Sequence, residues 1–222
     1  MKAFCLAGIL CLLTVPAAAQ SPVTAPQRVL PLDPLTPEER TVGEEIARAN
    51  DRVREFLAKG RSQLIYVEFI AVKRDGAQAE PSGRFADVLF YRYDDDAGLR
   101  VLVDLGARIV ADIVPVPGHS VPLTFDEVQE AARLALASGE VARLLGDNAG
   151  SFRPARGPAT REQMNENRIE GLRTLGSTPD DPCTRDRCVV LFFRTRNRYI
   201  AMNRVVVDLT TNRVMVNNGA QP

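Results

Sequence analysis

The chain has 222 residues, with 28 Lys and Arg against 28 Asp and Glu, four cysteines, one histidine and no tryptophan. A net charge near zero gives no electrostatic basis for binding nucleic acid or an anionic membrane surface. A single histidine excludes a multi-histidine metal site within the chain, and we expect neither a metal nor a cofactor.

Residues 1–19 have the features of a cleaved signal peptide. Lys2 precedes an apolar stretch from Ala3 to Val15, and Ala17 to Ala19 form a small-residue cleavage site. The apolar stretch is too short for a permanent transmembrane helix, so no membrane span is expected. Cleavage leaves 27 basic and 28 acidic groups and two cysteines, with residues 20–32 as an N-terminal extension. We therefore predict a periplasmic or secreted protein.

Two segments 88 residues apart repeat the start of a helix. Residues 34–57 align without gaps with residues 122–145, and eight of the 24 pairs are identical. Thr36 and its equivalent in the second segment each precede a glutamate by three residues, a capping box that satisfies free amides at a helix start. Apolar residues then recur at steps of three and four, which indicates a helix. Asn50 and Ser138 occupy matching positions and are good N-cap residues, so each helix is expected to restart there.

Strand-like segments follow each helix. The first unit is expected to contain strands at Leu64–Lys73, Arg84–Tyr93, Leu99–Asp104 and Arg108–Val116, joined by turn residues such as Asp75-Gly76. The second unit is expected to contain strands at Cys188–Thr195, Arg198–Asp208 and Arg213–Val216, after an insertion over residues 146–182 in which Arg161–Leu172 forms a short helix. Short connections between successive strands imply antiparallel neighbours.

The strands repeat as well as the helices. Val88–Arg92 matches Val190–Arg194 at an offset of 102, and Val101–Leu105 matches Val205–Leu209 at an offset of 104. A helix across one face of each sheet would cover its apolar side. The sequence therefore predicts an α+β protein of two tandem units, residues 33–119 and 120–222, each a helix packed on an antiparallel sheet.

Cys183 and Cys188 are the two cysteines that remain after cleavage. In an oxidising compartment, two cysteines with four residues between them can close a small ring across a turn, so we predict a structural disulfide. A redox pair usually has two intervening residues, and a zinc site needs four ligands. A lipid anchor on Cys11 is the alternative to a soluble protein, but Leu10 is larger than the residue that precedes a lipidated cysteine.

Several segments, taken in order, resemble the N-terminal domains of copper amine oxidases. They are the proline-rich lead Leu30–Glu39, the strand Tyr66–Lys73, the run Val103–Leu105, the join Val114–Gly118 with Pro122–Thr124, and more weakly Asn197–Val214. The resemblance is to the second and third N-terminal domains. It implies two cystatin-like α+β units that are peripheral to catalysis.

The departure from that family concerns its catalytic domain. Copper amine oxidases use three histidine ligands for copper and a tyrosine-derived quinone, whereas this chain has only His119. The signal peptide, the tandem repeat and the lack of a catalytic constellation therefore predict an exported, non-catalytic binding protein that resembles those N-terminal domains, and not an enzyme. Two alternatives are an accessory subunit that docks on a separately encoded copper amine oxidase, and a cystatin-like protease inhibitor, although the Gln-x-Val-x-Gly loop of cystatins is missing.

Other candidate residues have ordinary structural explanations. His119 lies in the join between the units, with no partner in the sequence that would position it as a base. Asp94, Asp95 and Asp96 lack the alternating ligands of a calcium loop and are expected at a solvated hairpin tip. The aspartates of the two Val-Asp-Leu sequences are expected to cap turns at strand ends.

Arginine outnumbers lysine by 25 to three and is concentrated in the last strands. Because arginine binds carboxylates and phosphates through two parallel hydrogen bonds, the candidate partner surface is Arg194, Arg196, Arg198 and Arg204. Its partner would be an unknown protein or an anionic ligand in the cell envelope. The alternative is an arginine-rich composition with charges alternating on a solvent-exposed face.

Overall fold

The computed structural model describes residues 33–71, 83–155, 166–196 and 198–217, apart from the side chains of residues 201–203. The expected signal peptide, the extension and the turn at Asp75-Gly76 lie outside the described residues. The first half contains a helix pair and a four-stranded antiparallel sheet in the order β1-β2-β3-β4. Its elements are α1 (Pro37–Ala49), α2 (Asp51–Ala58), β1 (Ser62–Ile70), β2 (Phe85–Arg92), β3 (Ala97–Asp104) and β4 (Ile109–Pro117).

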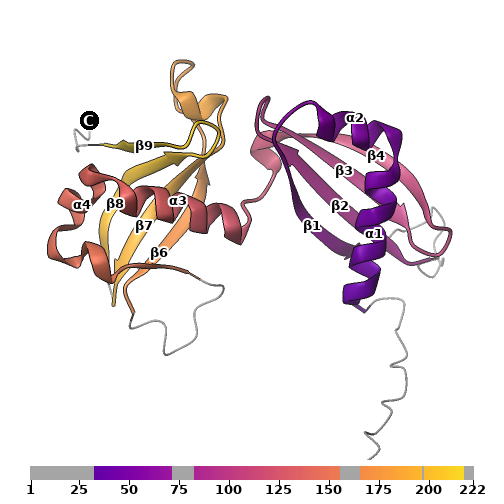
Figure 1. Cartoon of the computed structure of the whole chain (residues 1–222), viewed down its shortest axis with the longest axis horizontal. Helices are drawn as coiled ribbons and strands as arrows, with labels where there is room; N and C mark the ends of the chain where they lie inside the picture. The colour runs from indigo at the N-terminus through magenta and orange to yellow at the C-terminus, as the bar shows by residue number, and fades with distance from the viewer. Residues whose placement is uncertain (1–32, 72–82, 156–165, 197, 218–222) are drawn as a thin grey trace, which may run out of the picture. The chain divides into compact units, whose positions relative to one another are not determined.

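The second half repeats this order with additions. Its elements are α3 (Phe125–Ala137), α4 (Gly139–Leu145), β5 (Arg153–Pro154), β6 (Arg168–Thr174), β7 (Cys188–Thr195), β8 (Arg198–Asp208) and β9 (Arg213–Val216), with short 3₁₀ helices at η1 (Gly118–Ser120), η2 (Gly146–Ser151) and η4 (Pro182–Thr184). The sheet order is β5-β6-β7-β8-β9, parallel only between β5 and β6. One helix, α1 or α3, lies across one face of each sheet (Figure 1), which confirms the predicted α+β class.

The capping boxes are formed at both helix starts. The side chain of Thr36 accepts a hydrogen bond from the amide of Glu39, and the Glu39 carboxylate accepts one from the amide of Thr36. Thr124 and Glu127 make the same reciprocal pair at the start of α3. Asn50 caps α2 as predicted. Ser138 occupies the N-cap position of α4, but its side chain makes no capping hydrogen bond there.

The short helix predicted at Arg161–Leu172 is wrong over its described part. Residues 161–165 lie outside the described residues, and Arg168–Thr174 is strand β6, paired antiparallel with β7. The packing of this strand against α3 depends on Gly171, because a Cβ placed there would lie 2.9 Å from Val189 and 3.0 Å from Val128 of α3. The glycine lets α3 pack directly on the sheet. β6 is thus a strand of the second half in addition to the three that the sequence predicts for it.

The structural equivalence between β2 and β7 is shifted by one residue from their sequence match. Val88 pairs with Val101, but Val205, which lies 104 residues beyond Val101, pairs with Leu191 and not with Val190. The structural offset is therefore 103 and not 102. Because alternate side chains of a strand point to opposite faces, this slip turns Val190 away from the helix-covered side.

Strand β2 is buried on both of its faces. Val88 and Phe90 belong to the core beneath α1. Leu89 and Tyr91 on the opposite face, with Tyr93 just after the strand, belong to a second core that also contains the helix-facing side chains of β7 and β8. Residues 31–222 form one compact unit that contains both sheets, so the expected limits at residues 33–119 and 120–222 stay predictions. In the part of the chain that the structure describes, the helices are too short or too polar to cross a bilayer.

A buried ion pair links α3 to the residue before β7. The guanidinium of Arg187 donates to both carboxylate oxygens of Glu127, with Nη2 at 2.9 Å from Oε2. It also donates to the carbonyl oxygens of Val121 and Pro122, at 3.3 and 2.7 Å, and lies 4.1 Å from the ring centre of Tyr91. Neither partner of the pair has more than 3% of its side chain exposed. Buried charges need such compensation, because transfer of an unpaired charge out of water is very costly.

The pKa of Glu127 follows from two opposing effects. Burial alone would raise it, but the hydrogen bonds and charge of Arg187, with smaller contributions from Thr124 and Tyr93, hold the pKa of Glu127 below its ordinary value. The Tyr93 hydroxyl donates to Glu127 Oε1 at 2.8 Å. Burial first, and then the negative charge of Glu127, raise the pKa of Tyr93. Glu127 is therefore ionised at neutral pH and acts only as an acceptor.

We predict that Glu127→Gln lowers the free energy of unfolding by about 3 kcal/mol at pH 7, because Arg187 is left buried without a counter-charge. The lowered pKa means that Glu127 stabilises the fold fully above its unfolded value of 4.5 and loses this effect as the pH falls through the folded value. The difference between wild type and variant should therefore shrink in acid, as measured by urea unfolding at pH 7 and at pH 3.

The matched control is Glu130→Gln on the same helix. Glu130 pairs with Arg133 at the surface, where its side chain is 42% exposed. Solvent screening makes such a pair weak, so the control should unfold at the same urea concentration as wild type. Equal unfolding midpoints for all three proteins at pH 7 would contradict the role given to the buried pair.

Candidate binding site

The helix-free face of the second sheet carries a row of apolar side chains across four strands. Leu172 of β6 pairs with Val190 of β7, Val190 with Val206 of β8, and Val206 with Met215 of β9. Their neighbours Val189 and Val207 face the opposite way, into the core beneath α3. Leu172 is 61% exposed, and the other three members of the row are half-buried. The row is therefore accessible from one side.

Aromatic residues extend this apolar face toward the turn between β7 and β8. Phe192 lies on the same face as Val190, and its ring centre is 6.2 Å from that of Tyr199, edge to face. The Tyr199 side chain is 46% exposed, and its hydroxyl lies 3.4 Å from Glu170. We call Leu172, Val190, Phe192, Tyr199, Val206 and Met215 the helix-free face. A contiguous exposed apolar patch of this kind is typical of an interaction surface.

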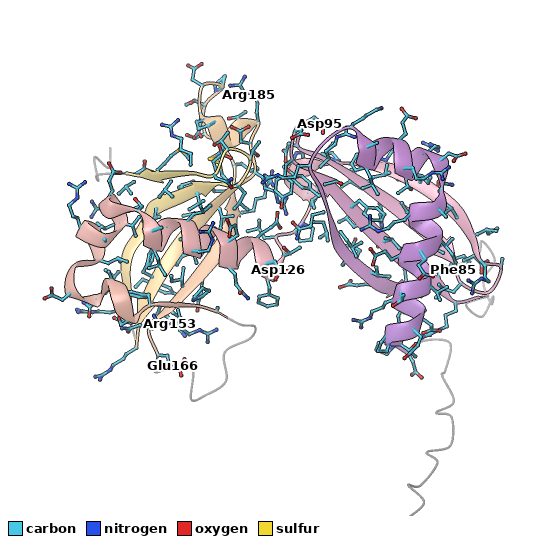
Figure 2. The ribbon with its side chains drawn as sticks, in the orientation of Figure 1. Phe85, Asp95, Asp126, Arg153, Glu166 and Arg185 are labelled. Carbon is cyan, nitrogen blue, oxygen red and sulfur yellow. A yellow bond between two sulfur atoms is a disulfide. The ribbon has the colours of Figure 1, made fainter. Side chains whose placement is uncertain are left out.

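A groove of 810 Å³ lies at one end of the helix-free face. Its floor includes Val190, Val206 and Met215, and its wall is the loop between β6 and β7, which contributes Leu175, Ser177, Asp181, Pro182 and Cys183. Arg185 marks this loop in Figure 2. The volume lies within the range of ligand-binding pockets, and an apolar floor with a few polar rim groups is their usual composition.

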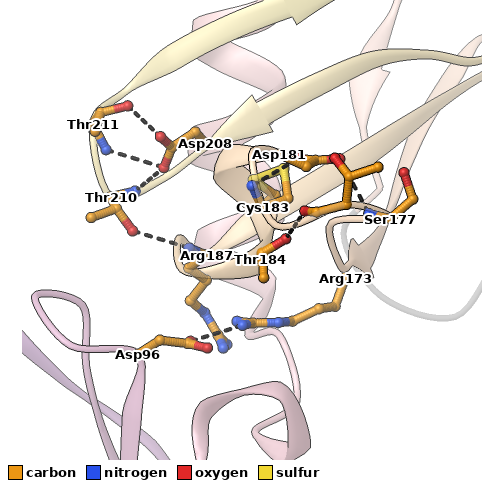
Figure 3. Close-up of a disulfide and its surroundings, with 12 residues drawn as sticks. Asp96, Arg173, Ser177, Asp181, Cys183, Thr184, Arg187, Asp208, Thr210 and Thr211 are labelled. Carbon is orange, nitrogen blue, oxygen red and sulfur yellow. Dashed lines mark hydrogen bonds and ion pairs between the residues drawn. A yellow bond between two sulfur atoms is a disulfide. The ribbon is translucent and has the colours of Figure 1, made fainter.

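The predicted disulfide between Cys183 and Cys188 is present and closes this loop (Figure 3). Asp181 holds the loop from within, because its carboxylate accepts hydrogen bonds from the amides of Cys183 and Ser177 at 2.9 and 3.3 Å. The Thr184 hydroxyl donates to the carbonyl of Thr178 at 2.7 Å. The groove wall is thus fixed by a covalent ring and local hydrogen bonds.

The four arginines of the predicted partner surface do not form one surface. Arg194 lies on the helix-free side, 3.6 Å from Glu170, and Arg204 donates to the carbonyl of Asn217 at 3.1 Å. Arg196 and Arg198 instead line a separate cavity at the β7–β8 turn. The prediction joined them because they are close in sequence, whereas the alternation of side chains along β7 and β8 separates them.

The remaining candidates take structural roles. His119 is exposed in η1. The aspartates of the hairpin tip are not simply solvated as expected: Asp94 accepts from the amide of Arg61, Asp95 pairs with Arg92, and Asp96 pairs with Arg173 at 2.8 Å. In the described ranges, no three His, Cys, Asp or Glu side chains are grouped so that they could hold a metal ion.

The aspartates of the two Val-Asp-Leu sequences cap turns, as predicted. Asp104 accepts from the amide of Ala107 at 2.9 Å, and Asp208 accepts from the amides of Thr210 and Thr211 at 2.7 and 3.2 Å. Burial, and then the charge of Asp208, raise the pKa of Asp186. Asp208 organises its turn beside the disulfide loop (Figure 3).

The helix-free face was not among the predicted sites, although the sequence holds a signal for it. Residues 188–193 are continuously apolar, which is typical of a strand buried on both faces and not of a half-exposed one. Val190–Arg194 indicates a repeat and Cys188–Thr195 a strand, but neither pattern shows which face of the strand stays open. The groove had no such signal, because its wall and floor come from segments far apart in the sequence.

Comparisons with known proteins give matches to solved structures but none by sequence. No protein-family model and no curated protein matches the sequence. Among solved structures, the chain is similar to a copper-containing benzylamine oxidase from Hansenula polymorpha, with a TM-score of 0.48 and 15% identity over 87% of this chain. The match spans 31% of that enzyme's chain.

We predict that the Cys183→Ala, Cys188→Ala double variant lowers the free energy of unfolding by about 2 kcal/mol, from the chain entropy of so short a ring. The intact mass of the oxidised wild type should be two hydrogens lower than that of the reduced protein. Two thiols that alkylate freely in the native, untreated protein would contradict the bond.

Proposed function

We propose that the mature chain is an exported, non-catalytic binding protein, and that a partner protein covers the helix-free face. The observation that carries this proposal is strand β7. It is apolar on both faces, like β2, yet among the described residues only the face toward α3 is covered. In β2, by contrast, every residue is buried. A bound partner would bury the second face of β7, just as the chain itself buries both faces of β2.

Charge at the margin of the face indicates the chemistry of the partner. Arg194, Arg204 and Arg213 lie on the helix-free side by strand alternation, around the apolar row. Arginine at the rim of an apolar patch is common in protein interfaces and pairs well with carboxylates. We therefore propose a partner protein that presents apolar side chains bordered by Asp or Glu.

Export and the absence of catalysis are supported by the sequence and by the disulfide. Residues 1–19 have the pattern of a signal peptide. A structural disulfide such as Cys183–Cys188 persists in oxidising compartments outside the cytoplasm. The proposal of a non-catalytic role rests on two features of the full sequence. It contains a single histidine, and it contains neither a nucleophile motif nor a phosphate-binding motif.

The export proposal predicts a specific N-terminus. When the full-length chain is expressed in a Gram-negative host, N-terminal sequencing of the periplasmic fraction should begin at Gln20, directly after the Ala17–Ala19 site. An uncleaved chain retained in the cytoplasm would contradict export, and a mature chain that begins with a lipidated Cys11 would identify the alternative signal.

The binding proposal predicts selective loss of the partner from a face variant. Leu172→Glu/Tyr199→Glu changes two exposed side chains, so the fold should remain intact, but it places charge on the helix-free face. Wild type and variant, immobilised as baits, would be compared on an envelope extract. The partner should be retained by wild type and reduced at least tenfold on the variant, because burial of an unpaired carboxylate in an apolar interface is costly.

The matched control is Ile109→Glu/Val114→Glu, which changes two equally exposed apolar residues of β4 in the first sheet. This bait should retain the same protein as wild type. Retention on all three baits, or loss from both variants, would contradict docking on the helix-free face. Self-association of the purified chain that disappears only in the face variant would identify a second copy as the occupant, and would contradict the partner proposal.

A further inference from the structure

A second cavity, of 530 Å³, lies at the turn between β7 and β8. The described residues that line it are Asn148, Asn167, Thr195, Arg196, Arg198 and Ile200. Ile200 packs against the core beneath α3, so this cavity is on the helix side of the sheet and not on the helix-free face. It is separate from the groove beside the disulfide loop.

The two arginines of this cavity differ from most arginines of the protein. Arg173 pairs with Asp96, Arg187 with Glu127 and Arg84 with Glu39. In the described part of the chain, the guanidinium groups of Arg196 and Arg198 make no hydrogen bond or ion pair. Two positive charges thus share one concave site without a counter-charge, which is favourable for an anion.

The turn itself holds the arginines close together. Thr195 pairs with Arg198 across the hairpin, and Arg196 occupies the turn with a φ of 42°. That left-handed conformation favours Gly, Asn or Asp, so the hairpin carries an arginine where its backbone would favour another residue. The side chains of both arginines are exposed, which leaves them free to reorient toward a ligand.

The asparagine side of the cavity is fixed by a chain of hydrogen bonds. Asn167 donates from Nδ2 to the Ser151 hydroxyl at 2.6 Å, and this hydroxyl donates to the carbonyl of Asn148 at 2.6 Å. Arg153 donates to the carbonyls of Gly150 and Phe152, both at 2.8 Å, and so holds η2 in place. These bonds connect η2 to the start of β6 and provide a fixed wall opposite the arginines.

Among the described residues that line the cavity there is no carboxylate. Asp147 and Glu166 precede the two asparagines in sequence, but neither belongs to the lining. Figure 2 shows Glu166 and Arg153 at the end of the second sheet opposite Arg185, which marks the disulfide loop. The described lining is therefore composed of hydrogen-bond donors and neutral groups with a positive pair at one side.

We propose that this cavity binds the oxyanion group of a small ligand, a phosphate or a carboxylate, through the guanidinium groups of Arg196 and Arg198. Guanidinium groups bind both oxyanions through parallel charge-assisted hydrogen bonds. The volume of 530 Å³ suits a ligand of small-molecule size. This site is independent of the partner proposed for the helix-free face, because the two surfaces lie on opposite sides of the sheet.

The test is a titration of the mature chain with inorganic phosphate and, separately, with succinate, followed by the backbone amide NMR signals of residues 195–200. Wild type should show saturable shifts with at least one probe, and the stronger probe identifies phosphate or carboxylate as the preferred group. The affinity should fall as sodium chloride is added, since salt screens charge interactions.

The variant Arg196→Gln/Arg198→Gln should weaken binding about 100-fold, because each charge-assisted hydrogen bond contributes on the order of a tenfold change in affinity. The control Arg40→Gln/Arg52→Gln removes the same net charge from two exposed arginines of the first half and should bind like wild type. Absence of saturable binding of both probes to wild type, or equal affinities of wild type and the Arg196/Arg198 variant, would overturn the proposal. The capture experiment on the helix-free face is unaffected by either result.

Discussion

Glu127 is the residue on which several parts of the structure depend at once. Its carboxylate completes the capping box at the start of α3, neutralises Arg187 in the interior, and accepts a hydrogen bond from Tyr93 of the first half. Arg187 in turn lies against the ring of Tyr91 and immediately precedes Cys188 and strand β7. The position of α3 on the second sheet, the entry into β7 and the buried far face of β2 therefore share one charged centre.

The consequence for recognition lies in how the two sheets use their second faces. The far face of β2 is buried within the chain, in a core that includes Leu89 and Tyr91. The far face of β7 carries apolar residues of the same kind, including Val190 and Phe192, but they remain half-exposed. Because of the one-residue shift between the two strands, residues that match in sequence face opposite sides: Val88 faces the helix, whereas Val190 faces away from it. A similar pentapeptide thus serves the core in one half and an open surface in the other.

Local signals in the sequence were sufficient to predict most helices and strands. Features that depend on contacts between distant segments could not be predicted in this way. The capping boxes and the limits of β7, β8 and β9 follow from hydrogen-bond chemistry and alternation within a few residues. β6 was missed because the glycine that lets α3 approach, Gly171, has no meaning until the helix is placed above it. The burial of Arg187 was missed for the same reason, since its partner lies 60 residues away. Adjacent arginines were grouped although strand alternation places Arg194 and Arg198 on opposite sides.

The disulfide ring has a consequence for how the chain acquires its native state. The ring closed by Cys183 and Cys188 includes Arg187, so the bond restricts the backbone of the residue that must enter the interior as a cation. By thermodynamic linkage, contacts that stabilise the native position of Arg187 also raise the effective concentration of the two thiols for each other. Oxidation of the two cysteines and burial of the Arg187 guanidinium therefore reinforce each other. The redox potential of the surroundings thus becomes part of the folding equilibrium of the second half.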